Sequence, residues 1–169
     1  VVVAQLEVPI AAVTSALRIA REAGARSVLN PSPIGPGTAL VGEADVVVVN
    51  QAEAAHLAGA DHEATGPDDA LAQARSIAAP DRTVVVTLGG EGAVAAGPEG
   101  DVTVAGVPVT AVDTTGAGDC FLGVLAAGLV EGSDLGPALD RANRAAALAV
   151  TRNGTVDAMP ARADLDRAS

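Results

Sequence analysis

The chain has 169 residues, 49% of them hydrophobic and 18% charged, which is enough apolar material to bury the core of one domain and excludes a disordered protein. Its 21 acidic residues outnumber ten basic ones, and the net charge of −11 would oppose binding to nucleic acid. No apolar run approaches the ~20 residues that cross a bilayer, and no secretory signal is recognisable. We expect a soluble protein without nucleic-acid or membrane partners.

Cysteine and aromatic residues are scarce. Cys120 is the single cysteine, so it has no partner for an internal disulfide, and a reducing, cytoplasmic location fits. Two histidines with one cysteine are too few for the usual zinc sites. Phe121 is the only aromatic residue, so the stacking surfaces of many ligand pockets are missing. Ligand recognition would therefore depend on backbone amides and glycines.

The first half of the chain alternates strands and helices. Short apolar runs predict strands at 1–5, 27–30, 46–49 and 83–87. Apolar residues at helical spacing between these runs predict helices at 9–24, 51–57 and 65–78. Prolines and glycines at 30–37 predict a loop. The continuous valine runs indicate strands buried on both faces of a mainly parallel sheet.

The second half begins with glycine-rich turns and ends with helices. Short apolar segments at 93–96 and 102–105 predict a hairpin, and 107–112 has the composition of a strand. Helices are predicted at 118–130, 135–150, with Asp134 as N-cap, and 161–167. We see no repeat and no second domain boundary, which predicts a single α/β domain over residues 1–169. Because the chain starts in a strand-like run without Met, we expect it to be part of a longer protein.

The most informative motif runs from Asp113 to Asp119. Gly116, Ala117 and Gly118 leave the amides at a helix N-terminus uncovered, and such amides bind anions such as phosphate. Asp119 beside an anion site would repel the ligand unless it accepts a proton from an attacking hydroxyl. A glycine-rich turn with Asp119 stabilising the helix start is the structural alternative.

Three further segments each allow two interpretations. Residues 87–92 (TLGGEG) could approach a nucleotide closely or form a hairpin turn. Asn50 and Glu53 have the spacing of a capping box, while Glu53 could instead hold, through water, the magnesium of a nucleoside triphosphate. Glu7 follows the first strand, where ligands gather in open α/β sheets, but it could equally be a solvated turn residue.

The remaining reactive side chains favour structural interpretations. His56 and His62 have no partners at metal-ligand spacing and are expected at the surface or at helix ends. Cys120 is expected to be a small packed side chain, although a helix N-terminus would lower the pKa of a thiol.

Taken in order, these segments resemble the ribokinase family of pfkB-type carbohydrate kinases. Residues 113–121 (DTTGAGDCF) look like its C-terminal signature, and 87–92 and Asn50 with Glu53 support the resemblance. Within the family, residues 5–7, 30–33 and 150–154 are most similar to the ribokinases. The resemblance covers the whole chain but only the C-terminal half, or slightly more, of the family's length. It implies a ribokinase-like, Rossmann-type sandwich whose N-terminal part and lid are absent.

The resemblance also implies roles for individual residues. Asp119 would be the catalytic base and would contact the sugar. Glu7 would be a second sugar contact. The anion hole would consist of Gly116, Ala117 and Gly118. Glu53 would hold Mg2+ indirectly, through water. The implied nucleotide contacts are Asn50, Thr87, Gly89, Gly90, Glu91, Gly92, Gly118 and Asn143. The implied monovalent cation (K+) site comprises Asp113, Thr115, Ala149, Arg152 and Gly154, and Ala158 departs from the pattern because ribokinase has Ser there.

The implied function is ATP-dependent phosphorylation of a sugar hydroxyl, with ribose as the expected substrate, by a kinase that is a homodimer at full length. Fructose, 2-keto-3-deoxygluconate or a nucleoside are alternative substrates. A truncated, non-catalytic nucleotide-binding or regulatory domain is the alternative from another class. We expect the 169-residue chain alone to be inactive, because the walls around a sugar would be missing.

Overall fold

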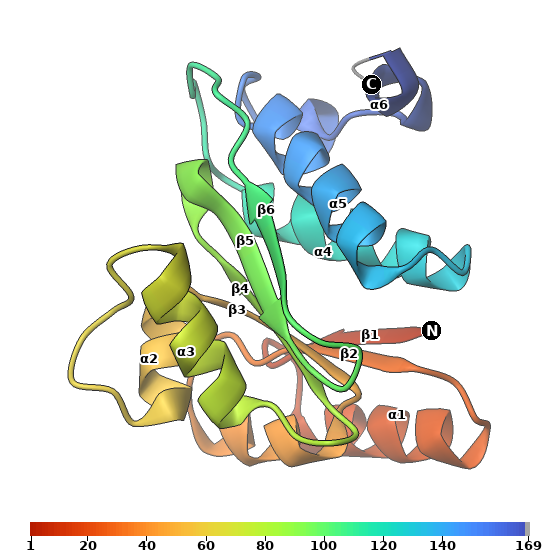
Figure 1. Ribbon diagram of the computed structural model, residues 1–169. Helices are drawn as coiled ribbons and strands as arrows, with labels where there is room; N and C mark the ends of the chain where they lie inside the picture. The colour runs from red at the N-terminus through yellow and green to blue at the C-terminus, as the bar shows by residue number, and fades with distance from the viewer. Residues whose placement is uncertain (168–169) are drawn as a thin grey trace. The chain divides into compact units, whose positions relative to one another are not determined.

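A computed structural model describes residues 1–167 of the chain (Figure 1). It has six strands and six α-helices in the order β1, α1, β2, β3, α2, α3, β4, β5, β6, α4, α5 and α6. The chain forms two compact units, which we describe separately. The first unit comprises Val1–Leu88 with Val94–Val102, and the second comprises Gly89–Ala93 with the residues from Thr103 onward.

The strands form one sheet in the order β1-β2-β3-β4-β5-β6. Their bounds are β1 Val2–Gln5, β2 Ser27–Asn30, β3 Val46–Asn50, β4 Thr83–Thr87, β5 Gly92–Ala96 and β6 Val102–Ala105. The pairs β1–β2, β2–β3 and β3–β4 are parallel. Successive valines of β3 and β4 are all buried, so both faces of these strands are covered, as the valine runs predict. The predicted α/β class with a mainly parallel sheet is confirmed.

Three helices of the first unit cover one face of these strands (Figure 1). They are α1 Ile10–Glu22, α2 Gln51–Ala58 and α3 Pro67–Ile77. Leu17 of α1 and Ala74 of α3 share a hydrophobic core with alternate valines of the strands, including Val47 and Val84. Alternate residues of a strand point to the same face, so this core lies between the helices and that face.

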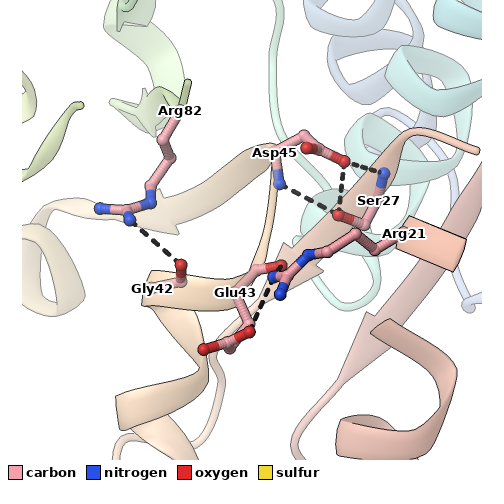
Figure 2. A network of polar contacts seen from close by, with 6 residues as sticks. All are labelled: Arg21, Ser27, Gly42, Glu43, Asp45 and Arg82. Carbon is pink, nitrogen blue, oxygen red and sulfur yellow. Dashed lines mark hydrogen bonds and ion pairs between the residues drawn. The ribbon is translucent and has the colours of Figure 1, made fainter. Parts of the chain in front are cut away.

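The predicted loop at 30–37 is irregular at residues 31–35, and its last two residues begin a 3-10 helix, Pro36–Glu43. Proline is compatible with a first helical turn, where its missing N–H would have no partner. A polar network holds the end of this helix (Figure 2): Arg21 donates to the Glu43 carboxylate (2.7 Å), and Arg82 donates to the Gly42 carbonyl (3.3 Å). These partners are distant in the sequence, so local composition alone could not reveal this helix.

The same network joins the starts of β2 and β3 (Figure 2). The Asp45 carboxylate accepts hydrogen bonds from the backbone and hydroxyl of Ser27, both at 2.7 Å, and the Ser27 hydroxyl accepts one from the Asp45 backbone at 3.0 Å. These reciprocal bonds hold the two parallel strands together at their amino ends.

β5 and β6 are neighbouring strands joined by the turn at residues 97–100, as the hairpin prediction requires. At the end of these strands opposite the turn, two glycines allow the backbone segments at 90–92 and 104–106 to lie close together. A side chain at Gly92, which has φ +105°, would overlap the Val104 carbonyl, and one at Gly106 would overlap the Gly90 carbonyl. These positions require glycine for packing, whatever else they do.

The second unit contains α4 Ala117–Val130, α5 Leu135–Ala149 and the short α6 Arg162–Arg167. α4 and α5 pack together closely at Gly128, where an added Cβ would lie 3.0 Å from the Ala138 Cβ. Asp134 occupies the N-cap position of α5, as predicted, although its side chain makes no capping hydrogen bond. Among residues 1–167, no helix is long and apolar enough to cross a membrane.

The predicted strand at 107–112 is absent, and this segment is irregular and mostly exposed. Pro108 has no N–H to donate to a ladder. At the end of the segment, the backbone N–H groups of Val112 and Asp113 donate instead to the Val150 carbonyl at 2.7 and 3.2 Å. The apolar composition therefore reflects a loop bound to the end of α5, not a strand.

Candidate functional site

In the first unit, polar residues line the carboxyl edge of the parallel strands. Gln5 pairs in register with Asn30, and Asn50 pairs with Thr87. The Asn30 amide donates to the Val48 carbonyl (2.8 Å), and the Thr87 hydroxyl to the Val49 carbonyl (3.3 Å). Ligands of open α/β sheets bind at this edge. Asn30 is a candidate contact that sequence reasoning missed, although an Asn that ends a strand was a usable signal.

The remaining candidates of the first unit lie near the same edge. Glu7 is exposed and closely follows β1, and Asn50 is exposed at the end of β3. Glu7, Asn50 and Thr87 all stand at or just beyond a strand's carboxyl end, which is the edge where open α/β sheets bind ligands. Their contacts with a nucleotide or sugar remain predictions.

Asn50 and Glu53 form the capping box that their spacing predicts. The Asn50 side chain accepts from the Glu53 backbone (2.9 Å), and the Glu53 carboxylate accepts from the Asn50 backbone (3.0 Å). Glu53 is only 9% exposed. Among residues 1–167, no three His, Cys, Asp or Glu side chains gather to hold a metal. The indirect role of Glu53 near magnesium, through water, remains a prediction.

The two roles of Glu53 can be separated by substitution. We expect Glu53→Gln to keep the melting temperature nearly unchanged, because the Gln carbonyl can still accept the Asn50 N–H. The same variant should raise the magnesium concentration needed for nucleotide binding several-fold, because the charge is lost. Glu53→Ala should in addition lose about 1 kcal/mol of stability with the cap. Calorimetry at varied Mg2+ gives both readouts; parent-like magnesium dependence of the Gln variant would leave capping as the sole role.

In the second unit, residues 89–91 form a short 3-10 turn after β4. Gly89 has φ +56°, which favours glycine, whereas a Cβ on Gly90 would meet nothing within 4 Å. Gly89, Gly90 and Glu91 are exposed, but Gly92 is buried. Three of these four residues are thus accessible to a nucleotide, while Gly92 is explained by the packing of β5 against β6. Nucleotide contacts here remain a prediction.

The residues predicted to form the anion hole lie at the N-terminus of α4. Gly116 is the N-cap residue with φ +77°, a backbone conformation that favours glycine, and Ala117, Gly118 and Asp119 form the first turn. The Ala117 N–H already donates to the Thr114 carbonyl (3.2 Å). A Cβ on the exposed Gly118 would meet nothing within 4 Å, so packing does not explain this glycine. The first turn instead presents an open surface to an approaching anion.

Asp113 fastens the loop that precedes this helix. Its carboxylate accepts from the backbone of Thr115 and from that of Gly154, both at 3.0 Å. The hydrogen bond from the Thr115 backbone, helped by that from Gly154, lowers the pKa of Asp113. Because the folded state has the lower pKa, this stabilisation is present at neutral pH and is lost as the pH falls through the lowered value.

The structure brings three of the proposed cation ligands together, since Asp113 bonds to both Thr115 and Gly154. The other two proposed ligands, Ala149 and Arg152, bond to each other, since the Ala149 carbonyl accepts from the Arg152 backbone (3.1 Å). The Arg152 guanidinium also lies 3.6 Å from the Asp164 carboxylate. Ala158 is buried and offers no side-chain oxygen. The cation site remains a prediction.

Asn143 and Cys120 are buried in the second unit. The Asn143 amide donates to the Ala105 carbonyl (2.8 Å), which joins α5 to the end of β6; its nucleotide contact remains a prediction. Cys120 is only 4% exposed, and its burial raises the pKa of the thiol. The interpretation of Cys120 as a packed side chain is therefore supported. His56 and His62 are exposed, as predicted, and His62 pairs with Asp69 at 3.2 Å.

The chain belongs to the pfkB family of carbohydrate kinases, whose sequence model matches residues 2–162. A ribokinase of Staphylococcus aureus is 36% identical over 163 residues, which cover 94% of this chain and 53% of that protein. The ribokinase of Cryptococcus neoformans in complex with ADP superposes with a TM-score of 0.87 at 24% identity, covering 99% of this chain and 59% of the other. The ribokinase-like fold is therefore confirmed.

A second solved structure, Arabidopsis thaliana ribokinase with ribose and ATP, has a TM-score of 0.83 at 25% identity and covers 98% of this chain and 54% of the other. The chain spans about half the length of the ribokinases that it matches. The match to the family thus covers nearly the whole of this chain but only about half of each full-length relative.

Proposed function

We propose that the chain is the nucleotide-binding and catalytic part of an ATP-dependent sugar kinase, which converts ribose to ribose 5-phosphate. The observation that carries this proposal is the N-terminus of α4, where Gly116 begins the helix in the left-handed conformation and Asp119 stands in the first turn. Family membership and the relatives named ribokinase support the reaction class and the choice of ribose.

The proposed reaction is an in-line phosphoryl transfer. Asp119 accepts the proton of the sugar's primary hydroxyl while the hydroxyl oxygen bonds to the γ-phosphorus, and the bond from that phosphorus to the bridging oxygen breaks, releasing ADP. Backbone amides of the first turn of α4 stabilise the charge on the transferring group. Glu53 would help to hold, through water, the magnesium ion that neutralises charge on the nucleotide phosphates.

The substrate contacts proposed from the first unit are Glu7 for the sugar, and Asn50 and Thr87 for the nucleotide. The last two are paired in register at the carboxyl ends of β3 and β4. The nucleotide contacts proposed from the second unit are Gly89, Gly90, Glu91 and Asn143. The Arabidopsis relative is described with ribose and ATP, which supports the same pair of small-molecule partners here.

The test is an ATP-consumption assay with ribose, fructose, 2-keto-3-deoxygluconate and a nucleoside, made on the complete polypeptide of the gene that contains this segment. Ribose should give the highest kcat/KM. A preference for another sugar would overturn the substrate, and nucleotide binding without turnover on any acceptor would favour the non-catalytic alternative.

The 169-residue chain alone is proposed to turn over no sugar. It spans about half the length of its relatives, and β1 at the edge of the sheet carries Val3, which is 45% exposed, next to the 42% exposed Val1 that precedes the strand. An apolar edge of this kind favours self-association. Sugar-dependent turnover by a monomeric chain, observed by assay with parallel sedimentation, would overturn this proposal.

The monovalent cation site gives a separate prediction. If Asp113, Thr115, Ala149, Arg152 and Gly154 bind K+ despite Ala158, replacing sodium by potassium at constant ionic strength should raise kcat of the complete polypeptide several-fold. Ala158→Ser should increase this response, because it restores an oxygen at that position. A rate indifferent to the cation in both proteins would show that these residues serve only the fold.

A further inference from the structure

The segment that follows α5 contacts the loop before α4 and the first residue of the helix start, Gly116. The Val150 carbonyl accepts from the backbone of Val112 and Asp113, and the Gly154 backbone donates to the Asp113 carboxylate. A Cβ placed on Gly116 would lie 3.6 Å from the Cβ of Thr155. The loop and helix start that carry the proposed anion hole are therefore in contact with residues 150–155.

α6 extends this contact with an apolar side chain. Leu165 is 7% exposed and shares a hydrophobic cluster with Cys120, Ala145 and Ala149. Cys120 directly follows Asp119 and is itself only 4% exposed. The same cluster thus joins α6, the end of α5 and the first turn of α4.

Ion pairs hold α6 in this position. Arg162 pairs with Glu131 at the C-cap of α4 (2.8 Å), and Asp164 pairs with Arg152 after α5 (3.6 Å). Asp164 also accepts from the backbone of Ala161 at the start of α6 (3.0 Å). Such exposed pairs contribute little stability individually, but they restrict where Leu165 can lie.

We propose that Leu165 is a positioning residue for the proposed catalytic turn. It closes the cluster around Cys120 and thereby holds the first turn of α4 and Asp119 in the orientation that phosphoryl transfer requires. This inference rests on the proposed function of Asp119. A small misplacement of a catalytic group costs much of its effect, so a side chain outside the site can control turnover through packing.

Cys120 provides a test that does not depend on activity, because the labelling of this buried thiol in the complete polypeptide can be measured on the peptide that contains it. We expect Leu165→Ala to increase the rate at which a small thiol reagent labels Cys120 by about tenfold or more, because the cluster opens locally. Leu165→Met should restore a nearly parental rate, because it refills most of the space. If Leu165→Ala does not fold, Leu165→Val should still increase the rate about threefold.

The matched control is Leu17→Ala, which truncates another buried leucine, in α1 of the first unit. It should lower the melting temperature without a local increase in Cys120 labelling. Parental labelling of a folded Leu165 variant, or an equal increase in the control, would overturn the proposal.

The functional readout uses the complete polypeptide. Leu165→Ala should lower kcat by about tenfold while the KM for ribose changes little, and Leu165→Met should restore kcat. An unchanged kcat in a variant with an exposed Cys120 would overturn the positioning role. Failure of the proposed function has a different signature: turnover would then survive Asp119→Asn, whatever the labelling of Cys120.

Discussion

Asp119→Asn is expected to reduce the turnover of the complete kinase by about 100- to 10,000-fold, because the amide cannot accept the proton of the attacking hydroxyl. Nucleotide affinity should change little, since the backbone amides of the first turn of α4 are unaffected. The side chain is exposed, so the substitution should not disturb the core. Steady-state kinetics and calorimetric titration with a nucleotide measure the two effects separately.

The control for this prediction is Asp134→Asn. Asp134 is also an acidic residue at a helix start, but it makes no capping hydrogen bond and lies at the beginning of α5. Its substitution should leave turnover near that of the parent. If Asp119→Asn also turned over at nearly the parental rate, Asp119 would not be the base, and the motif would retain only its anion-binding interpretation.

The elements that could be predicted from the sequence are those determined by local pattern. Val46 to Val49 are apolar on both faces and form a buried parallel strand, and Asn50 with Glu53 forms the capping box that begins α2. The start of α4 follows the same rule, because glycines beside Asp119 before an apolar run are a local signal; the catalytic role of this turn remains a prediction. In each case the residues that determine the structure are close together in the sequence.

The features that could not be predicted depend on distant partners. Residues 107–112 have the composition of a strand, but Val112 bonds to Val150, far along the chain. The 3-10 helix from Pro36 is held by contacts from Arg21 and Arg82. No spacing rule indicates that Asp113 would bond to Gly154, or that α6 would reach the cluster of Cys120.

Substitution of two glycines can separate residues that serve packing from residues that serve the proposed function. Gly92→Ala should destabilise the fold by about 3 kcal/mol or more, because φ +105° strains any other residue and the new Cβ overlaps the Val104 carbonyl. Thermal or denaturant unfolding measures this loss. A Gly92→Ala variant as stable as the parent would show that β5 and β6 can separate at this point.

Gly118→Ala should have the opposite profile. Its Cβ meets nothing within 4 Å, and alanine favours a helix over glycine by about 1 kcal/mol, so the fold should be at least as stable as the parent. Turnover should nevertheless fall by about 100-fold, because the methyl group would prevent close approach of the phosphoryl oxygens to the backbone amides. Gly123→Ala, also in α4 and also facing open space, is the matched control and should gain stability with unchanged turnover. Equal turnover in the two variants would exclude the first turn of α4 as the anion hole, whereas a loss confined to Gly118→Ala would assign that glycine to phosphoryl transfer.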